Sequence, residues 1–111
     1  MLSFRNRLKK QKDFEKIFKN GKSFKQGSLY LRINKNDLQS SRFGFIVSKK
    51  FSKKAVERNR IKRILREVVK ERIEEVIKGL DVAIIVNPET KADFQELKKT
   101  IDILFKKSGL I

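Results

Sequence analysis

Apolar residues recur at helical spacing near the start of the chain. Phe14, Ile17 and Phe18 share one face of a helix that we expect to run from about residue 12 to residue 20. Gly21 follows at a position where a glycine commonly ends a helix. The pattern therefore predicts a short amphipathic helix.

The pattern then changes to the alternation that is typical of strands. Leu29, Leu31 and Ile33 fall on one face of the segment 23–34, and mostly polar residues fall on the other. Gly27 is expected to divide this segment into two strands. Another strand is predicted over residues 42–48. Because these three strands lie close together in the sequence, we expect them to form a meander.

The second half of the chain alternates between helix and strand. A helical pattern runs from the end of the loop 49–54 to about Lys78, just before Gly79. Residues 81–87 are mostly β-branched or apolar, which predicts a strand covered on both faces. Thr90 and Asp93 resemble a capping box for a last helix that ends near Gly109. Its apolar stripe consists of Phe94, Leu97, Ile101, Leu104 and Phe105.

The predicted fold class is therefore α+β, with the order helix, three strands, helix, strand, helix. A chain of 111 residues fits one domain, and we treat residues 1–111 as a single domain. Residues 1–10 carry four cations and few core residues, so we expect an extended basic arm that is flexible without a partner.

Charge changes this picture more than any other feature. The chain has 29 Lys and Arg against 13 Asp and Glu, a formal net charge of +16. Residues 1–66 hold 21 of the basic and 4 of the acidic side chains. This asymmetry predicts a binding face for a polyanion in the first part of the chain. The lack of Cys, of a signal-peptide pattern and of a membrane-length apolar run favours the cytoplasm, without a membrane partner. Gly-rich phosphate loops are absent from the sequence, and we expect no small-molecule substrate.

The long predicted helix gathers its cations on one face. Ile61, Ile64, Leu65 and Val68 form its buried stripe, so the opposite face presents five cations and an amide without a carboxylate between them. A solvated surface with a chance cluster is the alternative. The charge asymmetry and the bidentate chemistry of Arg favour an RNA contact instead.

Aromatic residues offer a second candidate surface. Tyr30 and Arg32 lie on the polar face of a predicted strand, where they could hold single-stranded RNA. Phe14 and Phe18 have the spacing of core residues. The other possibility is that the helix leaves their rings partly open to a cleft in which bases stack.

Catalytic groups are missing from the sequence. The chain has no His, and its basic part holds only four scattered carboxylates. A protein nuclease usually needs a His or a carboxylate cluster that holds metal. We therefore predict no catalytic residue and no metal site.

Two segments resemble the signature of the bacterial ribonuclease P protein. They are Val47-Ser48-Lys49-Lys50 and the run from Ala55 to Glu67, which includes Arg58-Asn59-Arg60-Ile61-Lys62-Arg63. Arg5-Asn6-Arg7-Leu8, residues 13–18 and residues 81–85 also match in order. One departure is Ser52, where many relatives have Gly in the loop before the helix.

The resemblance implies a two-layer α/β sandwich with a left-handed β-α-β crossover around the long helix, although crossovers are generally right-handed. It implies a protein subunit that helps a catalytic RNA remove the 5′ leader of precursor tRNA. The partners implied are ribonuclease P RNA and precursor tRNA, with Mg²⁺ held mainly by the RNA and the catalytic centre in the RNA.

The site residues carried over by position form two sets. The leader-binding set is Phe14, Phe18, Tyr30, Ser48, Lys49, Lys50 and Lys53. The set that contacts the catalytic RNA is Arg58, Asn59, Arg60, Lys62, Arg63 and Arg66. A ribosomal or other structural RNA-binding protein is the alternative. A DNA-binding regulator and a stand-alone nuclease are less favoured, because neither a helix-turn-helix arrangement nor catalytic residues are found.

Overall fold

The computed structural model describes residues 2–111, and its centre is a four-stranded sheet in the order β1-β2-β4-β3. The strands are β1 (Lys22–Gln26), β2 (Leu29–Lys35), β3 (Arg42–Val47) and β4 (Leu80–Val86). The helices are α1 (Gln11–Asn20), α2 (Ala55–Arg72) and α3 (Phe94–Ser108), and a short 3-10 turn, η1, covers Phe4–Asn6. The α+β class and the element order agree with the prediction.

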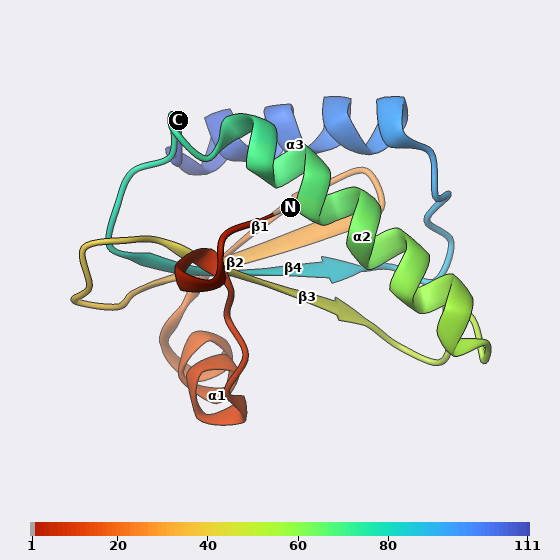
Figure 1. Cartoon of the computed structure of the whole chain (residues 1–111), viewed down its shortest axis with the longest axis horizontal. Coiled ribbons are helices and arrows are strands. Elements are labelled where there is room, and N and C mark those ends of the chain that lie inside the picture. Colours follow the sequence, from red (N-terminus) through yellow and green to blue (C-terminus); the bar gives the residue numbers. More distant parts are fainter. Residues whose placement is uncertain (1) are drawn as a thin grey trace.

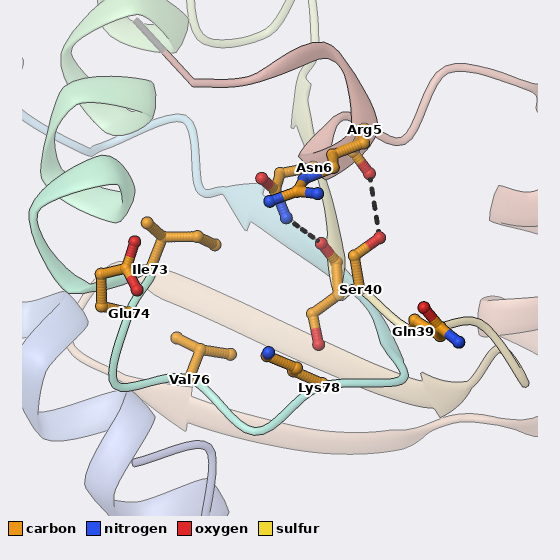
Figure 2. A pocket seen from close by; sticks show the side chains of 9 residues that line it. Arg5, Asn6, Gln39, Ser40, Ile73, Glu74, Val76 and Lys78 are labelled. Atoms are coloured by element: carbon orange, nitrogen blue, oxygen red, sulfur yellow. Dashed lines mark hydrogen bonds between the residues drawn. The ribbon is translucent and has the colours of Figure 1, made fainter.

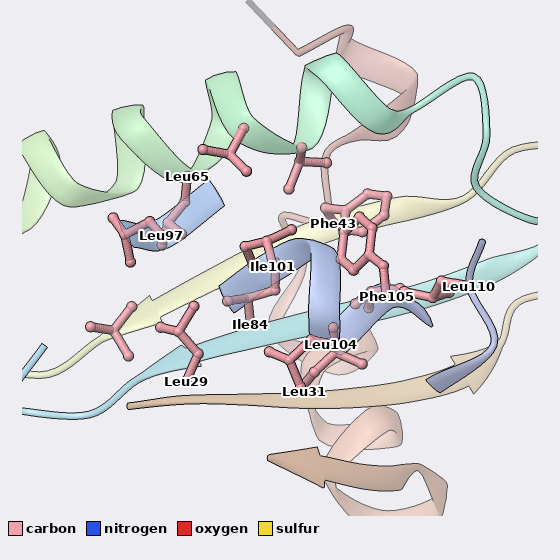
Figure 3. Packing of buried hydrophobic residues seen from close by; sticks show 14 of the residues in the cluster. Leu29, Leu31, Phe43, Leu65, Ile84, Leu97, Ile101, Leu104, Phe105 and Leu110 are labelled. Carbon is pink, nitrogen blue, oxygen red and sulfur yellow. The ribbon is translucent and has the colours of Figure 1, made fainter. Parts of the chain in front are cut away.

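The helices divide between the two faces of the sheet (Figure 1). Helices α2 and α3 lie on one face, and α1 lies on the other. The main core fills the space between the sheet and the α2–α3 layer, with Leu31, Phe43, Leu65, Ile84 and Phe105 almost fully buried in it (Figure 3). A smaller core under α1 is formed by Leu8, Ile17 and Ala83, with Phe14 and Ile46 against it.

The predicted meander is wrong, because β4 lies between β2 and β3. It pairs antiparallel with β2 and parallel with β3, so α2 forms the crossover between two parallel neighbours. The strand is apolar on both faces, and Val82, Ala83 and Ile84 are fully buried. A strand that is apolar on both faces is best covered at the centre of a sheet. The short separation of β1, β2 and β3 in the sequence did not indicate that β4 lies between β2 and β3.

Helix α2 ends at Arg72, six residues before the predicted Lys78. There the guanidinium of Arg72 binds both carboxylate oxygens of Asp102 in α3, at 2.8 Å each. The chain then turns, so that Val76 reaches the core and the Ile77 amide donates to the Leu110 carbonyl at 2.9 Å. Gly79 has a φ of +87° in the turn before β4 and does not cap the helix.

The start of α3 also differs in detail from the sequence pattern. The carboxylate of Asp93 accepts hydrogen bonds from the amides of Gln95 and Glu96, so Asp93 is the N-cap. Thr90 instead donates its hydroxyl hydrogen to the Ser28 carbonyl. At the other end, Gly109 has a φ of +80° and ends the helix as predicted.

The described part of the basic arm is folded against the domain. Leu2 and Leu8 are buried, and the Leu8 amide donates to the Phe43 carbonyl at 2.8 Å. This bridge partly covers the free edge of β3. Met1, the first residue of the predicted arm, lies outside the described residues.

Candidate nucleic-acid interface

Two surfaces contain the predicted site residues, and the first lies beside α1. Alternation along the strands puts Tyr30, Arg32, Ala83, Gly44 and Ile46 on the same face as α1. Helix α1 covers one row of this face. Ile17 packs with Ala83, and the Phe14 ring lies on Gly44.

The neighbouring row of the sheet is less covered. Strand pairing aligns Lys25, Tyr30, Ile85 and Ile46 across the four strands, and none of the four is fully buried. The Lys25 ammonium lies 5.2 Å from the centre of the Tyr30 ring. Beside α1 the sheet therefore offers a row with an aromatic ring, a cation and apolar side chains. Ile46 of β3 and Ile85 of β4 also belong to this row. Each lies among other apolar residues of its strand, so the sequence pattern did not identify either of them as a site residue.

The two aromatic residues of α1 differ: one packs in the core and the other is exposed. Phe14 is half-buried and belongs to the smaller core. Phe18 is 44% exposed, and the Arg32 guanidinium lies 5.8 Å from the centre of its ring. The face beside α1 thus presents the Phe18 ring to solvent, while Phe14 mainly fixes the helix on the sheet.

Arg32 does not act as the free cation that its position on the strand indicated. Its guanidinium donates to the carbonyls of Phe18 at 2.9 Å and of Gly21 at 3.0 Å, and to the Ser23 hydroxyl at 2.8 Å. These carbonyls lie at the C-terminal end of α1, where the helix dipole favours a positive charge. Arg32 therefore holds α1 in place on the sheet.

The loop after β3 carries the remaining residues of the leader-binding set. Ser48, Lys49, Lys50 and Lys53 are all exposed. The Arg58 guanidinium donates to the Ser52 carbonyl at 2.8 Å and ties the loop to the start of α2. Ser52 is not among the residues with positive φ, so the loop does not require Gly there.

The second surface is the outer face of α2. Ile61, Leu65, Val68 and Val69 are buried, and Ile64 packs against the core, which places the cations on the other side as predicted. The exposed residues of the predicted set are Asn59, Arg60 and Arg63, and the half-buried ones are Arg58, Lys62 and Arg66. No group of three or more His, Cys, Asp or Glu side chains within residues 2–111 could hold a metal ion.

A cavity of about 250 Å³ joins the two surfaces at the edge of β3. Lys62 and Arg66 line it from α2, Phe14 lines it from α1, and Arg7 and Lys9 line it from the arm. The Arg66 guanidinium also lies 6.0 Å from the centre of the Phe45 ring. The lining includes four cations and no carboxylate, so the arm extends the basic face of α2. The charge of the arm is evident from the sequence, but Arg7 and Lys9 are not among the predicted site residues.

The protein-family model described as Ribonuclease P matches residues 2–109. The chain belongs to the ribonuclease P protein family. A relative from Clostridioides difficile, a ribonuclease P protein component, is 41% identical, and the match covers 93% of this chain and 91% of the relative. The corresponding component from Bacillus velezensis is 42% identical over 96% of this chain and 91% of its own length.

Solved structures agree with this family membership. The ribonuclease P protein from Thermotoga maritima is 32% identical and superposes with a TM-score of 0.80, covering 90% of this chain and 96% of that one. The Staphylococcus aureus protein is 28% identical with a TM-score of 0.82, covering 95% of this chain and 96% of that one. The resemblance inferred from the sequence is thus confirmed, and a ribosomal or other structural RNA-binding role is not favoured.

Proposed function

We propose that the chain is the accessory protein of a ribonuclease P complex in which a catalytic RNA cleaves precursor tRNA. In this proposal the outer face of α2 binds the catalytic RNA and the sheet face beside α1 binds the 5′ leader. The observation that carries it is the cavity at the edge of β3, because it brings Lys62 and Arg66 of α2 together with Phe14 of α1.

The division of labour follows from the chemistry of each surface. Exposed Arg and Lys on a helix suit the phosphates of a folded RNA, since guanidinium groups bind phosphate in bidentate fashion. The exposed Phe18 ring and half-buried Tyr30 suit an unpaired leader, whose bases can stack on aromatic rings. Lys49, Lys50 and Lys53 then lie where they can attract the leader phosphates.

The cleavage chemistry is assigned to the RNA. The chain has no His, and its described carboxylates do not gather into a metal site. Mg²⁺ would therefore be held mainly by the RNA, where it supplies the metal-assisted hydrolysis of the phosphodiester. The protein would contribute binding and charge neutralisation in the cytoplasm. No helix of the described residues is both long and apolar enough to cross a membrane.

The test is cleavage of a precursor tRNA by the cognate catalytic RNA, with and without the protein, over a range of Mg²⁺ concentrations. We expect the protein to raise the rate most at low Mg²⁺, because its cations replace part of the charge neutralisation that Mg²⁺ provides. Protein incubated with precursor tRNA alone is the control. Equal rates with and without the protein would refute the proposal, and so would cleavage by the protein alone.

A further inference from the structure

A cavity of about 770 Å³ lies at the end of the sheet away from the proposed leader surface (Figure 2). Three segments line it: η1, the connection between β2 and β3, and the connection between α2 and β4. It opens where β3 begins, whereas Ser48 follows the end of β3. A six-residue strand, roughly 20 Å long, separates the two places.

The cavity is held open by bonds between its three segments. The Asn6 side chain donates to the Ser41 carbonyl at 2.8 Å, and the Ser41 hydroxyl donates to the Ile77 carbonyl at 2.5 Å. The Ser41 oxygen also accepts from the Leu80 amide at 3.1 Å. Ser41 and Val76 are both buried. A ligand would therefore meet a site that is already formed, which lowers the ordering cost of binding.

The lining combines three kinds of group around one space. Arg5 and Lys78 are cations, Asn6, Gln39 and Glu74 carry amides or a carboxylate, and Ile73 and Val76 form an apolar wall. In Figure 2 these side chains surround the same opening from different segments. Cations suit a phosphate, amides and carboxylates suit the edge of a base, and an apolar wall suits its face.

The same three segments also carry exposed apolar side chains next in sequence to lining residues. Phe4 in η1 is 74% exposed, and Leu38 and Ile77 are about half exposed. The Lys9 ammonium lies 3.8 Å from the centre of the Phe4 ring. An exposed ring beside a cation is a platform on which a neighbouring base can stack.

We propose that this cavity binds one nucleotide of single-stranded RNA whose base carries an exocyclic amino group, namely adenine, cytosine or guanine. The Glu74 carboxylate only accepts hydrogen bonds, so it favours a base edge with an amino donor. The pairing edge of uracil places its single N–H between two carbonyl oxygens, which a carboxylate repels. The proposal rests on the proposed function only for the choice of RNA as the partner.

The first experiment is a titration of the full chain, followed by nuclear magnetic resonance, with hexaadenylate and hexauridylate. The side-chain amide signals of Asn6 and Gln39 report on the cavity. We expect hexaadenylate to shift both signals and hexauridylate to leave them in place. Absence of a shift with hexaadenylate, or equal shifts with both, would overturn the proposal.

Two sets of variants test the lining. Replacing both cations (Arg5→Ala with Lys78→Ala) should weaken hexaadenylate binding at this site by at least about fivefold, because two phosphate contacts are lost. Replacing two exposed cations of α3 (Lys99→Ala with Lys106→Ala) is the matched control and should have a smaller effect. Glu74→Gln should remove the preference over hexauridylate, whereas Glu89→Gln should keep it. A preference that survives Glu74→Gln would contradict the proposed role of the carboxylate.

The variant Phe18→Ala separates this cavity from the proposed leader surface. The hexaadenylate shifts of Asn6 and Gln39 should persist in it, because Phe18 lies on α1 and does not line the cavity. Loss of the shifts would show that they report binding elsewhere and would overturn the proposal. The cleavage assay with the catalytic RNA tests the proposed function independently of these signals.

The source of the nucleotide can be read from the assembled complex. A photoreactive group attached to Gln39→Cys would be activated in the presence of both the catalytic RNA and precursor tRNA. Crosslinks to unpaired nucleotides of the catalytic RNA would identify it as the ligand, and crosslinks to the leader would identify the substrate. If neither RNA is crosslinked, the cavity does not bind RNA in the complex and the proposal fails.

Discussion

The Phe14 ring lies directly on the backbone of Gly44. A Cβ atom at position 44 would overlap the tip of the ring and come within 3.2 Å of the Leu8 Cβ. The Phe14 ring of α1 can therefore lie against β3 because position 44 has no side chain. This contact, together with the packing of Ile17 on Ala83, positions α1 on the face proposed to bind the leader.

Gly44→Ala should accordingly destabilise the fold by about 1–3 kcal/mol, the range for overpacking a filled site. Urea unfolding would measure the change. The double variant Phe14→Leu with Gly44→Ala should recover part of the loss, because the smaller side chain makes room for the added methyl group. Equal stability of Gly44→Ala and the wild type would show that the ring moves freely.

Arg42 connects α1 to the centre of the sheet. Its guanidinium binds both carboxylate oxygens of Asp81 at 2.8 and 2.7 Å and reaches Asp13 of α1 at 3.4 Å. Asp81 is buried, and this ion pair and a hydrogen bond from Asn36 reduce the free-energy cost of burying its carboxylate. The same contacts raise the pKa of Arg42.

Arg42→Ala should therefore cost about 2 kcal/mol, since it leaves a buried carboxylate without its main partner while solvent reaches part of the site. Thermal or urea unfolding measures the loss. Arg60→Ala, an exposed change on α2, is the control and should stay within about 0.5 kcal/mol of the wild type. Similar values for the two variants would mean that Asp81 is well solvated.

The Arg72–Asp102 pair predicts a dependence of stability on pH. The hydrogen bonds from Arg72 lower the pKa of the Asp102 carboxyl. A lowered pKa in the folded state contributes stability above the unfolded pKa, near 4 for Asp, and this contribution disappears as the pH falls through the folded pKa. Asp102→Asn should therefore be less stable than the wild type at pH 6, and the difference should shrink towards pH 3.

Urea midpoints at both pH values would measure this change. Glu89→Gln is the control, because Glu89 is exposed, and its difference from the wild type should stay small at both pH values. If the difference in stability between Asp102→Asn and the wild type is the same at pH 6 and pH 3, the pair does not stabilise the ionised form of the Asp102 carboxyl.

Local signals predicted the parts of the fold that depend on neighbours in the chain. Gly27 divides β1 from β2 with a φ of +57°, and Gly109 ends α3 with a φ of +80°. The burial of Leu29 and Leu31 follows the alternation along the strand. In each case the deciding interaction lies within a few residues, so the sequence pattern carried it.

The features that were not predicted depend on residues far apart in the chain. The end of α2 is set by Asp102, thirty positions away, and the strand order is set by the need to cover β4 on all sides. The role of Arg32 required knowing that α1 ends above it. For the candidate site, the helical face of α2 could be predicted from its period, whereas the difference between Phe14 and Phe18 could not.

The outer face of α2 predicts how RNA affinity responds to salt. Each neutralised phosphate should contribute about 0.7 to 0.9 to the slope of the logarithm of affinity against the logarithm of salt concentration. Arg60→Ala should reduce the slope by about the contribution of one phosphate, because Arg60 is exposed on this face. Lys99→Ala on α3 is the control. Equal slopes for Arg60→Ala and the wild type would remove Arg60 from the interface.

The exposed ring of Phe18 allows the proposed leader surface to be tested apart from the fold. Because the ring is 44% exposed, Phe18→Ala should change stability little, and Ile103→Ala, at 47% exposure on α3, is the matched control. Stacking of a base on an aromatic ring is worth about 1–3 kcal/mol, so precursor tRNA should bind the complex roughly fivefold to 150-fold more weakly. Mature tRNA, which has no leader, should bind as before. Equal weakening of both RNAs would mean that Phe18 contacts the body of the tRNA or supports α1, and the assignment of Tyr30 to the leader would lose its basis as well.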